Sequence, residues 1–417
     1  MMDNRSSVDV AIVGAGASGL GAARTARELG LTSVVFEAMD RIGGRAHTDT
    51  ATFGVPWDRG CHWLHSADVN PFRILADEYG IRYRSTPTPR LVHLGDRWAT
   101  PEEAAAAETI VTDSYTAAAV AAAAGRDEAA TSVVHGGSPW LRFFKSAVAA
   151  EWGVGLDAAS TTDMTAYRDT SRNWPLQDGY GALVARHASG IEVELSTPVR
   201  SIEWDRLRPR VTTDAGTVEA GAVVVTASTS ALAAGAIRFI PELPAWKQEA
   251  LVAVPLGSAN KVAFGIDGRL LGVDEHTTLL ASMEDGTIVA FQLRPFGADM
   301  ANGYLAGPVG VELERAGEAA MLNAMRGALR GVYGSDITKQ ITVAACSTWG
   351  REPSIRGGYA AALPGQANRR QDLGRPVGDR LLFAGEATSP DFFSTCHGAH
   401  LSGIAAAHAA ARLSAVV

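Results

Sequence analysis

The sequence predicts two interleaved domains, one an α/β domain with a parallel sheet and the other an α+β domain of antiparallel sheet plus helices. A strand, a glycine-rich turn and a helix open the chain within residues 8–30, as in a βαβ unit. The same pattern of short apolar strands returns near residues 191–226, and a strand followed by a helix returns after residue 381. Alternating strands near residues 261–292 lie between these segments and favour an antiparallel sheet. The chain is therefore expected to leave the first domain and return to it twice.

Length, charge and cysteine content limit the possible functions. The 417 residues are enough for two or three domains with a sizeable core. The formal charge of −8 argues against general nucleic-acid binding and agrees with a cationic substrate. Cys61, Cys346 and Cys396 are too few and too scattered for a disulfide framework or a zinc site, so no metal centre is expected. We expect a cytoplasmic protein with no membrane partner, either a monomer or a homodimer.

The first βαβ unit can be placed residue by residue. Val8–Val13 is a short apolar run typical of a buried parallel strand. A helix is expected from about Ser18 to Leu29, with Gly30 as the glycine that ends it. Ser33–Glu37 is the second strand.

The remaining elements follow in a less regular order. Alanine-rich segments predict helices, and short β-branched runs predict strands. The predicted helices are Pro101–Ala124, Pro139–Ala150, one after Asp178, Glu312–Val332 and His397–Leu413. The predicted strands are Ile191–Leu195, Val199–Trp204, Arg210–Thr213, Ala222–Thr226, Lys261–Ile266, Thr278–Ser282, Thr287–Gln292 and Leu381–Ala384.

The turn after the first strand carries a dinucleotide-binding fingerprint. Gly14, Gly16 and Gly19 fit the G-x-G-x-x-G pattern, which permits a tight turn, close approach of a pyrophosphate and close helix–strand packing. The pyrophosphate would lie at the N-terminus of the following helix, where free N–H groups favour anions. Glu37 ends the next strand, where an acidic side chain accepts hydrogen bonds from ribose hydroxyls. The pattern indicates NAD or FAD.

Two further segments bear on the choice between these cofactors. Gly43 and Gly44 are flanked by Arg41 and Arg45, so backbone N–H groups and a fixed cation could reach a second stretch of phosphate. Near the C-terminus a strand ends at Gly385-Glu386, and a helix begins near Gly398. Such a helix N-terminus could face a ring that becomes anionic on reduction.

Together these segments resemble the FAD-dependent amine oxidases, a family that includes monoamine and polyamine oxidases. The resemblance covers nearly the whole chain and is carried by the fingerprint through Arg45, by Gly60–Pro71, by Asn260–Ile266 and by Trp349–Gly403. It implies a Rossmann-like FAD-binding domain formed by residues 1–84, 186–258 and 345–417. The substrate-binding domain would then consist of residues 85–185 and 259–344.

The resemblance implies FAD as the cofactor, with Glu37 on the adenosine ribose and Glu386 near the ribityl–pyrophosphate stretch. Monoamine oxidases attach FAD through a cysteine that directly precedes a tyrosine of their aromatic substrate cage. Gly358 stands at that position here, so non-covalent FAD is expected. The expected cofactor-binding residues are Gly14, Gly16, Ser18, Gly19, Glu37, Gly43, Gly44, Arg45, Val199, Gly385, Glu386, His397, Gly398 and Ala399.

Five residues are candidates for the catalytic centre by the same resemblance: Lys261, Tyr359, His65, Trp349 and Thr395. Lys261 lies in a predicted strand in which apolar and polar residues alternate, so its side chain could simply face solvent. In the resembled family, however, a lysine in such a strand holds a water against flavin N5. Trp349 and Tyr359 could be core aromatics, whereas the family places them beside the flavin and in one wall of an aromatic cage. Thr395 falls at the opposite wall, near Phe392 and Phe393. The cage is therefore expected to be more open than a pair of tyrosines.

The segment from Arg59 to Gly80 resembles acetylpolyamine and spermine oxidases. His65 matches a histidine that faces their substrate tunnel, although a hydrogen-bonded structural histidine is an equal alternative. His62 is expected to be structural. Cys61 and Ser66 depart from the family pattern, where small residues or glycine are usual.

The activity implied is hydride transfer from an amine α-carbon to flavin N5, giving an imine that hydrolyses to an aldehyde or ketone, with O2 reoxidising the flavin to yield hydrogen peroxide. A polyamine or another primary or secondary amine is the expected substrate. Alternatives are an L-amino-acid oxidase, a flavin-dependent desaturase of a lipophilic substrate and a non-catalytic flavin-binding protein. Candidates for a cation-binding carboxylate are Glu151, Asp169 and Asp178, and Arg168 or Arg172 could bind a substrate carboxylate.

Overall fold

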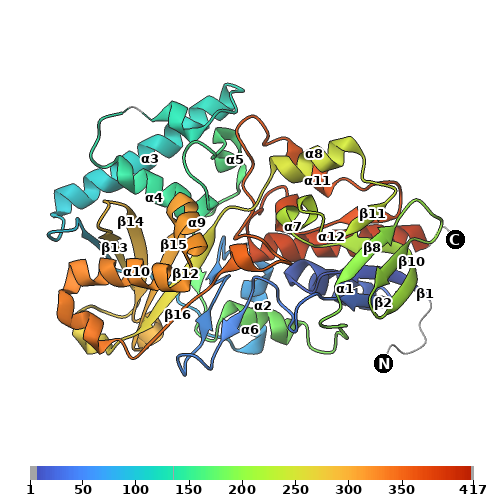
Figure 1. Ribbon diagram of the computed structural model, residues 1–417, viewed down its shortest axis with the longest axis horizontal. Helices are drawn as coiled ribbons and strands as arrows, with labels where there is room; N and C mark the ends of the chain where they lie inside the picture. The colour runs from blue at the N-terminus through green and yellow to red at the C-terminus, as the bar shows by residue number, and fades with distance from the viewer. Residues whose placement is uncertain (1–6, 135, 415–417) are drawn as a thin grey trace.

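The computed structural model describes residues 7–134 and 136–414 and contains two large sheets (Figure 1). The predicted FAD-binding domain also includes residues 1–6 and 415–417, which lie outside the described residues. The seven-stranded sheet lies on the right of Figure 1 with α1 (Ala17–Glu28) and α12 (Cys396–Ser414), and the six-stranded sheet lies on the left behind α10 (Glu318–Tyr333). The predicted combination of a Rossmann-like α/β part with a mixed α/β part is confirmed.

The seven-stranded sheet is built around β1 (Ser7–Val13), which pairs in parallel with β2 (Ser33–Phe36) and with β10 (Gly216–Val225). Its other strands are β8 (Val199–Glu203), β9 (Arg210–Thr213), β11 (Arg238–Ile240) and β17 (Leu381–Phe383). β9 pairs with the first half of β10, whereas β17 pairs with its second half. Strands that are more than 150 residues apart in the chain thus share one sheet.

Alternate residues of β1 face two different cores. Val10 and Ile12 pack with residues of α1 and α12 on one face of the sheet. Ala11 and Val13 pack on the other face with Leu232 of α7 (Thr229–Ala233). Because both faces are covered, this strand has the continuous apolar sequence that is typical of parallel sheets.

The six-stranded sheet runs in the order β16 (Val343–Cys346), β12 (Ala259–Gly265), β15 (Met300–Ala306), β14 (Ile288–Leu293), β13 (Thr277–Ser282), β6 (Arg90–His93). All neighbours are antiparallel except β13 and β6. Met321 and Met325 of α10 are buried with Val262 and Phe264 of β12 in the core of this sheet.

Helices cover the sheets and connect them. The capping box of α3 (Pro101–Ala123) shows how one of them starts: Thr100 Oγ1 accepts from Glu103 N at 3.3 Å, and Glu103 Oε2 accepts from Thr100 N at 2.9 Å. The other α-helices are α2 (Pro71–Tyr79), α4 (Leu141–Trp152), α5 (Thr161–Ala166), α6 (Tyr180–His187), α8 (Ala245–Ala253), α9 (Gly307–Ala316) and α11 (Arg369–Gly374). The 3-10 helices are Ala130–Val133, Gly268–Leu271, Pro295–Gly297, Ser335–Gln340, Trp349–Arg351 and Glu386–Thr388, and the short strand pairs are β3 (Thr48–Asp49) with β4 (Trp57–Asp58) and β5 (Trp63–Leu64) with β7 (Trp174–Pro175).

Two predicted elements are wrong. Ile191–Leu195 is not a strand, because it meets β2 only through a single bridge between Glu194 and Phe36. The helix expected over Glu312–Val332 is two helices, α9 and α10, separated at Gly317, whose φ of 106° is incompatible with a continuous α-helix. Strands β6, β11, β15 and β16 and the short pairs β3–β4 and β5–β7 were not predicted.

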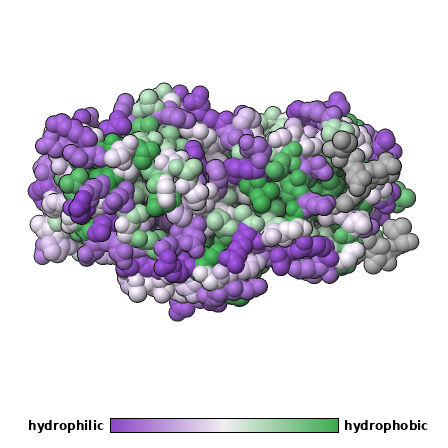
Figure 2. Space-filling view, turned by 90° about the horizontal axis from the view of Figure 1, so that it is seen from below, coloured by the Kyte–Doolittle hydropathy of each residue, from purple (hydrophilic) through white to green (hydrophobic). Residues whose placement is uncertain are grey.

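The face seen from below is mostly polar. Hydrophilic side chains cover much of it, and apolar side chains gather in a recess in the half that holds the seven-stranded sheet (Figure 2). Within the described part of the chain, no helix has both the length and the apolar character that crossing a bilayer requires.

Candidate active site

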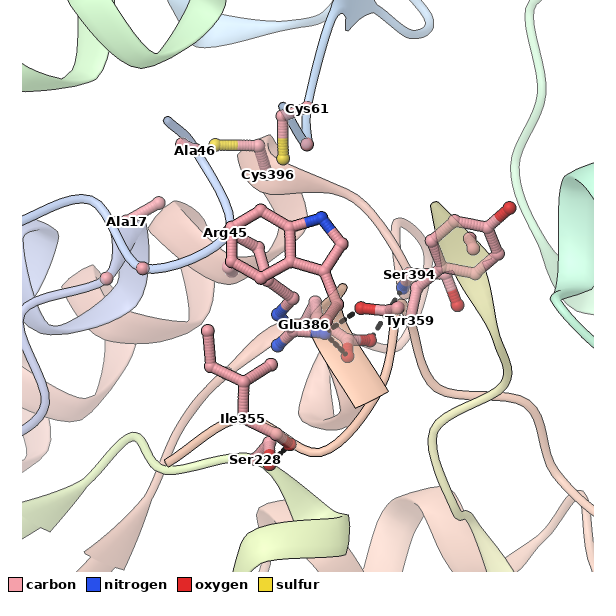
Figure 3. A pocket seen from close by; sticks show the side chains of 18 of the residues that line it. Ala17, Arg45, Ala46, Cys61, Ser228, Ile355, Tyr359, Glu386, Ser394 and Cys396 are labelled. Carbon is pink, nitrogen blue, oxygen red and sulfur yellow. Dashed lines mark hydrogen bonds and ion pairs between the residues drawn. The ribbon is translucent and has the colours of Figure 1, made fainter. Parts of the chain in front are cut away.

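A cavity of about 910 Å³ extends from the glycine turn after β1 to the inner residues of β12, β14 and β15. This volume is at the upper end of the range for small-molecule sites, about 300–1,000 Å³. Figure 3 shows part of the wall, to which Ala17, Arg45, Glu386 and Tyr359 contribute from distant parts of the sequence. The cavity therefore joins the nucleotide fingerprint to the second sheet.

The glycine turn leaves one side open and closes the other. A Cβ at Gly19 would lie 1.8 Å from the carbonyl oxygen of Gly14, so only glycine allows α1 to begin this close to β1. A Cβ at Gly16 would meet no protein atom within 4 Å, and Gly16 lines the cavity. No side chain caps the N-terminus of α1. Its first N–H groups are therefore available to an anionic group.

Glu37 joins the turn to the residues after β2. Its Oε2 accepts from Ala15 N at 2.6 Å, and its Oε1 accepts from Met39 N at 2.9 Å. The carboxylate is buried yet lines the cavity, and each oxygen keeps a second lone pair for a ligand hydroxyl. Val199, at the start of β8, lines the same end of the cavity.

Arg45 and Glu386 form an ion pair in the middle of the cavity wall. Arg45 Nη1 lies 2.9 Å from Glu386 Oε1 and also donates to the carbonyl oxygen of Gly358 at 2.5 Å. Glu386 accepts from Ala360 N at 3.2 Å and from Ser394 N at 3.0 Å. Figure 3 shows these groups in contact. The pair holds three chain segments together, and Arg45 keeps donors for a phosphate.

The start of α12 is divided between cavity and core. Thr395 Oγ1 accepts from Gly398 N at 3.1 Å, which caps the helix. Thr395 and Ala399 line the cavity, as do Ser18, Gly43, Gly44 and Gly385. His397 and Gly398 are not among the lining residues: His397 is buried against Phe392, and a Cβ at Gly398 would lie 1.8 Å from the carbonyl oxygen of Phe392. Gly19 has a packing role of the same kind.

Lys261 projects from β12 into the cavity. It is 4% exposed, and its Nζ has no hydrogen-bond partner among the described residues. This Nζ lies 5.4 Å from the ring centre of Tyr304 on β15. The two residues are direct cross-strand partners. Burial lowers the pKa of Lys261 to about 8, against the opposing charges of Asp58 and Cys61. A buried ammonium with no protein partner implies a water or a ligand atom beside it.

A buried carboxylate–imidazole pair lies next to Lys261. His62 Nδ1 is 3.0 Å from Asp58 Oδ2, and His62 Nε2 is 2.9 Å from Gln292 Oε1. Burial acts to raise the pKa of Asp58, but the hydrogen bond from His62 and the charge of Lys261 lower it overall. Burial, aided by Lys261, lowers the pKa of His62. His62 therefore lines the cavity while also holding Asp58, which combines a wall position with the structural role expected from the sequence.

Two predicted aromatic residues line the cavity between the cofactor end and Lys261. Trp349 donates from Nε1 to the carbonyl oxygen of Arg59 at 3.0 Å, which fixes its ring. The Tyr359 hydroxyl donates to the carbonyl oxygen of Ala150. Burial raises the pKa of Tyr359, so its hydroxyl keeps its proton.

His65 and two carboxylates lie at the far end. His65 Nδ1 is 2.8 Å from Asn173 Oδ1, and burial lowers its pKa. Glu151 and Asp169 both line the cavity, whereas Asp178 does not. Burial and the charge of Asp169 raise the pKa of Glu151, although a hydrogen bond from Tyr115 at 2.5 Å opposes them. Glu151 and Asp169 are both exposed to solvent and thus face the same open part of the cavity.

The sequence analysis missed several lining residues. Tyr304 and Gln292 lie on β15 and β14, and Thr226 and Ser228 follow β10. No motif marks any of them, since a lone tyrosine or threonine has no distinguishing spacing. Only the register of β12 with β15 places Tyr304 beside Lys261.

The residues present fit a dinucleotide cofactor. The uncapped α1 N-terminus, the open space at Gly16 and the carboxylate of Glu37 form a site for pyrophosphate and ribose. The cavity then continues past Arg45 to the buried amine of Lys261. This fold and site define a dinucleotide-dependent oxidoreductase.

Comparison with known proteins narrows the class. Residues 90–411 match the model of the flavin-containing amine oxidoreductases, and residues 12–79 match an NAD(P)-binding Rossmann-like domain. Polyamine oxidase 4 of Oryza sativa subsp. japonica is 29% identical, covering 95% of this chain and 87% of that protein. Lysine-specific histone demethylase 2 of Homo sapiens is 25% identical, covering 95% of this chain and 52% of that protein. A solved structure of a putrescine oxidase with redesigned cofactor binding shares the fold, with a TM-score of 0.78 and 21% identity over 98% of this chain and 99% of that one.

The chain belongs to the flavin-containing amine oxidoreductase family. It is an enzyme of amine oxidation with FAD as its cofactor, as the resemblance implied.

Proposed function

We propose that this enzyme oxidises a diamine or polyamine and that Glu151 and Asp169 bind the remote ammonium group of the substrate. The observation that carries this proposal is the pair of carboxylates in the cavity that also contains Lys261 and Tyr359. The charge of Asp169 raises the pKa of Glu151, so an ammonium placed between them would relieve their repulsion. Several relatives are named polyamine oxidases, which agrees with such a substrate.

The opposite end of the cavity favours a neutral amine. An amine nitrogen must be unprotonated before its α-carbon can lose a hydride equivalent. The ammonium of Lys261 repels a second ammonium and so lowers the pKa of an amine bound beside it. A substrate with two nitrogens is therefore oriented by charge: the charged nitrogen towards Glu151, the neutral one towards Lys261.

Bound FAD supplies the acceptor for the hydride equivalent. Its pyrophosphate would be held by the α1 N-terminus and Arg45, and its ribose by Glu37. Gly358 leaves no thiol at the position before Tyr359, which supports non-covalent binding. Lys261 Nζ would hold a water near the reacting atoms. Tyr359 and Trp349 would limit the orientation of the amine and exclude bulk water. We propose O2 as the electron acceptor, with hydrogen peroxide as the product.

The alternative of an L-amino-acid oxidase has less support. Arg168 and Arg172, the candidates for binding a substrate carboxylate, are not among the lining residues. Arg168 lies over the Phe392 ring, and Arg172 lies 3.6 Å from Asp68.

The test compares a diamine with a monoamine of the same chain length, using anaerobic bleaching of the flavin and peroxide release. Glu151→Gln and Asp169→Asn should each lower kcat/KM for the diamine by about ten- to a hundred-fold, since a charge-assisted hydrogen bond contributes about 1.5–3 kcal/mol. The monoamine should change much less. Asp178→Asn is the matched control, because Asp178 does not line the cavity. Equal losses for both substrates would exclude the proposed remote site, and bleaching by amino acids alone would exclude the substrate class.

A further inference from the structure

Two of the three cysteines lie together in the cavity wall. Cys61 follows the tight contact of Gly60 with Arg45, and Cys396 is the first residue of α12. Figure 3 shows their side chains beside one another near Ala46. Cys346, in β16, is not among the lining residues. A pair of thiols 335 residues apart in sequence is therefore brought together in the wall of the cavity.

The surroundings give the two thiols different reactivity. A hydrogen bond with Cys396 lowers the pKa of Cys61 and outweighs the opposing effect of burial. The charges of Arg45 and Lys261 lower this pKa as well, whereas that of Asp58 raises it. Burial raises the pKa of Cys396. Cys61 is half-buried and faces the cavity, whereas Cys396 is buried beside it. An accessible thiol with a lowered pKa next to a second thiol is the arrangement found in peroxide-sensitive cysteine pairs.

We propose that Cys61 and Cys396 are an oxidative modification site, at which a hydroperoxide converts the two thiols into a disulfide. The Cys61 thiolate attacks one oxygen of hydrogen peroxide, the O–O bond breaks and water leaves after protonation. Cys61 becomes a sulfenic acid, and the peroxide is reduced by two electrons. The Cys396 sulfur then attacks the Cys61 sulfur, an S–S bond forms, and the hydroxyl leaves with the Cys396 proton as a second water.

The disulfide would join two segments that form one wall. The Gly60–Cys61 segment packs on Arg45 and Trp349, and the start of α12 carries Thr395 and Ala399. Turnover by the proposed oxidase would supply peroxide inside this cavity. The site itself does not depend on that proposal, because peroxide from any source would serve as the oxidant.

The experiment uses the purified, pre-reduced holoenzyme with added hydrogen peroxide and no amine. Free thiols are counted after denaturation, and tryptic peptides are examined by mass spectrometry without reduction. We expect two of the three thiols to be lost, a peptide cross-linked through Cys61 and Cys396, and full recovery with dithiothreitol. Because no amine is present, this outcome is independent of the substrate and of oxidase activity.

Variants separate this pair from general oxidation. Cys346→Ala is the matched control and should form the same cross-link. Cys396→Ser should give no cross-link and should instead accumulate sulfenic and sulfinic acid at Cys61. Cys61→Ser should leave Cys396 reduced, and either variant suffices if the other does not fold. Survival of all three thiols in the wild type, a cross-link through Cys346, or irreversible oxidation of Cys61 with Cys396 still present would overturn the proposal.

Discussion

The two ends of the cavity are built by different means. At the nucleotide end, backbone atoms form much of the wall: Gly16 faces open space and no side chain caps the α1 N–H groups, while Gly19 behind them packs against the carbonyl oxygen of Gly14. At the amine end, side chains from separate strands form it, among them Lys261, Tyr304 and Glu151. Substitutions at the first end should therefore affect cofactor binding and folding together. Substitutions at the second should affect turnover while the fold remains.

The largest effect is expected at Gly19. Gly19→Val places side-chain atoms against the backbone of Gly14, so we expect a loss of more than about 4 kcal/mol in the free energy of unfolding and loss of bound flavin. Flavin-to-protein absorbance ratios and thermal unfolding check both. Gly30→Asn is the control: Gly30 has φ of 75° and open space at its Cβ position, and it should cost about 1 kcal/mol or less. Retention of flavin by Gly19→Val would contradict the steric role of this glycine.

Two buried lysines test whether substitutions at the amine end of the cavity affect turnover and leave the fold intact. Lys247 donates to the carbonyl oxygens of Asp372, Leu373 and Arg375 at 2.6–2.8 Å, whereas Lys261 Nζ has no protein partner. Lys247→Met should lower the free energy of unfolding by about 2–5 kcal/mol, since three carbonyls lose their donor. Lys261→Met should leave that free energy unchanged or higher and slow aerobic turnover. Chemical denaturation and oxygen-dependent kinetics measure the two effects. A large loss of stability in Lys261→Met would make that lysine structural.

The pH dependence of stability is the third test. The folded-state pKa of Lys261 is about 8, below its ordinary value of 10.5, so the unfolded chain binds more protons between these values. The stability of the wild type should therefore rise with pH across this window, relative to Lys261→Met, by about 2–3 kcal/mol. Denaturation of both proteins at pH 7.5 and pH 10 measures the difference. Parallel pH profiles would show that Lys261 keeps an ordinary pKa.

The smallest effect is expected at Thr395. Although it lines the cavity at the predicted cage position, its Oγ1 accepts from Gly398 N and caps α12. Thr395→Ala should cost about 1 kcal/mol of stability, as loss of an N-cap does, and Thr395→Ser should restore it. Thermal unfolding measures the stability, and KM for the amine measures the cage role. A change in KM that Ser does not restore would identify the Thr395 methyl group as a substrate contact.

Sequence reasoning succeeded where the relevant residues are contiguous. The strand, the glycine turn and Glu37 form one local unit, so a Rossmann-like dinucleotide site could be predicted from these residues. FAD and the family were predicted from the resemblance of four segments, and all three predictions are confirmed. The domain boundaries and the individual site residues stay predictions. The prediction of one continuous helix over Glu312–Val332 was wrong. A single glycine such as Gly317 is tolerated within a helical sequence pattern, and its positive φ, which separates α9 from α10, is seen only in the structure.

The sequence by itself determined the cofactor class, because backbone geometry at a tight turn demands glycine at fixed spacing. Only the tertiary structure decided which side chains share the amine end. Lys261 faces Tyr304 through strand register, Glu151 and Asp169 come from either side of α5, and Cys61 meets Cys396 across 335 residues. None of these pairs has a spacing in the sequence, because contacts between distant strands and helices depend on how the two sheets pack around the cavity.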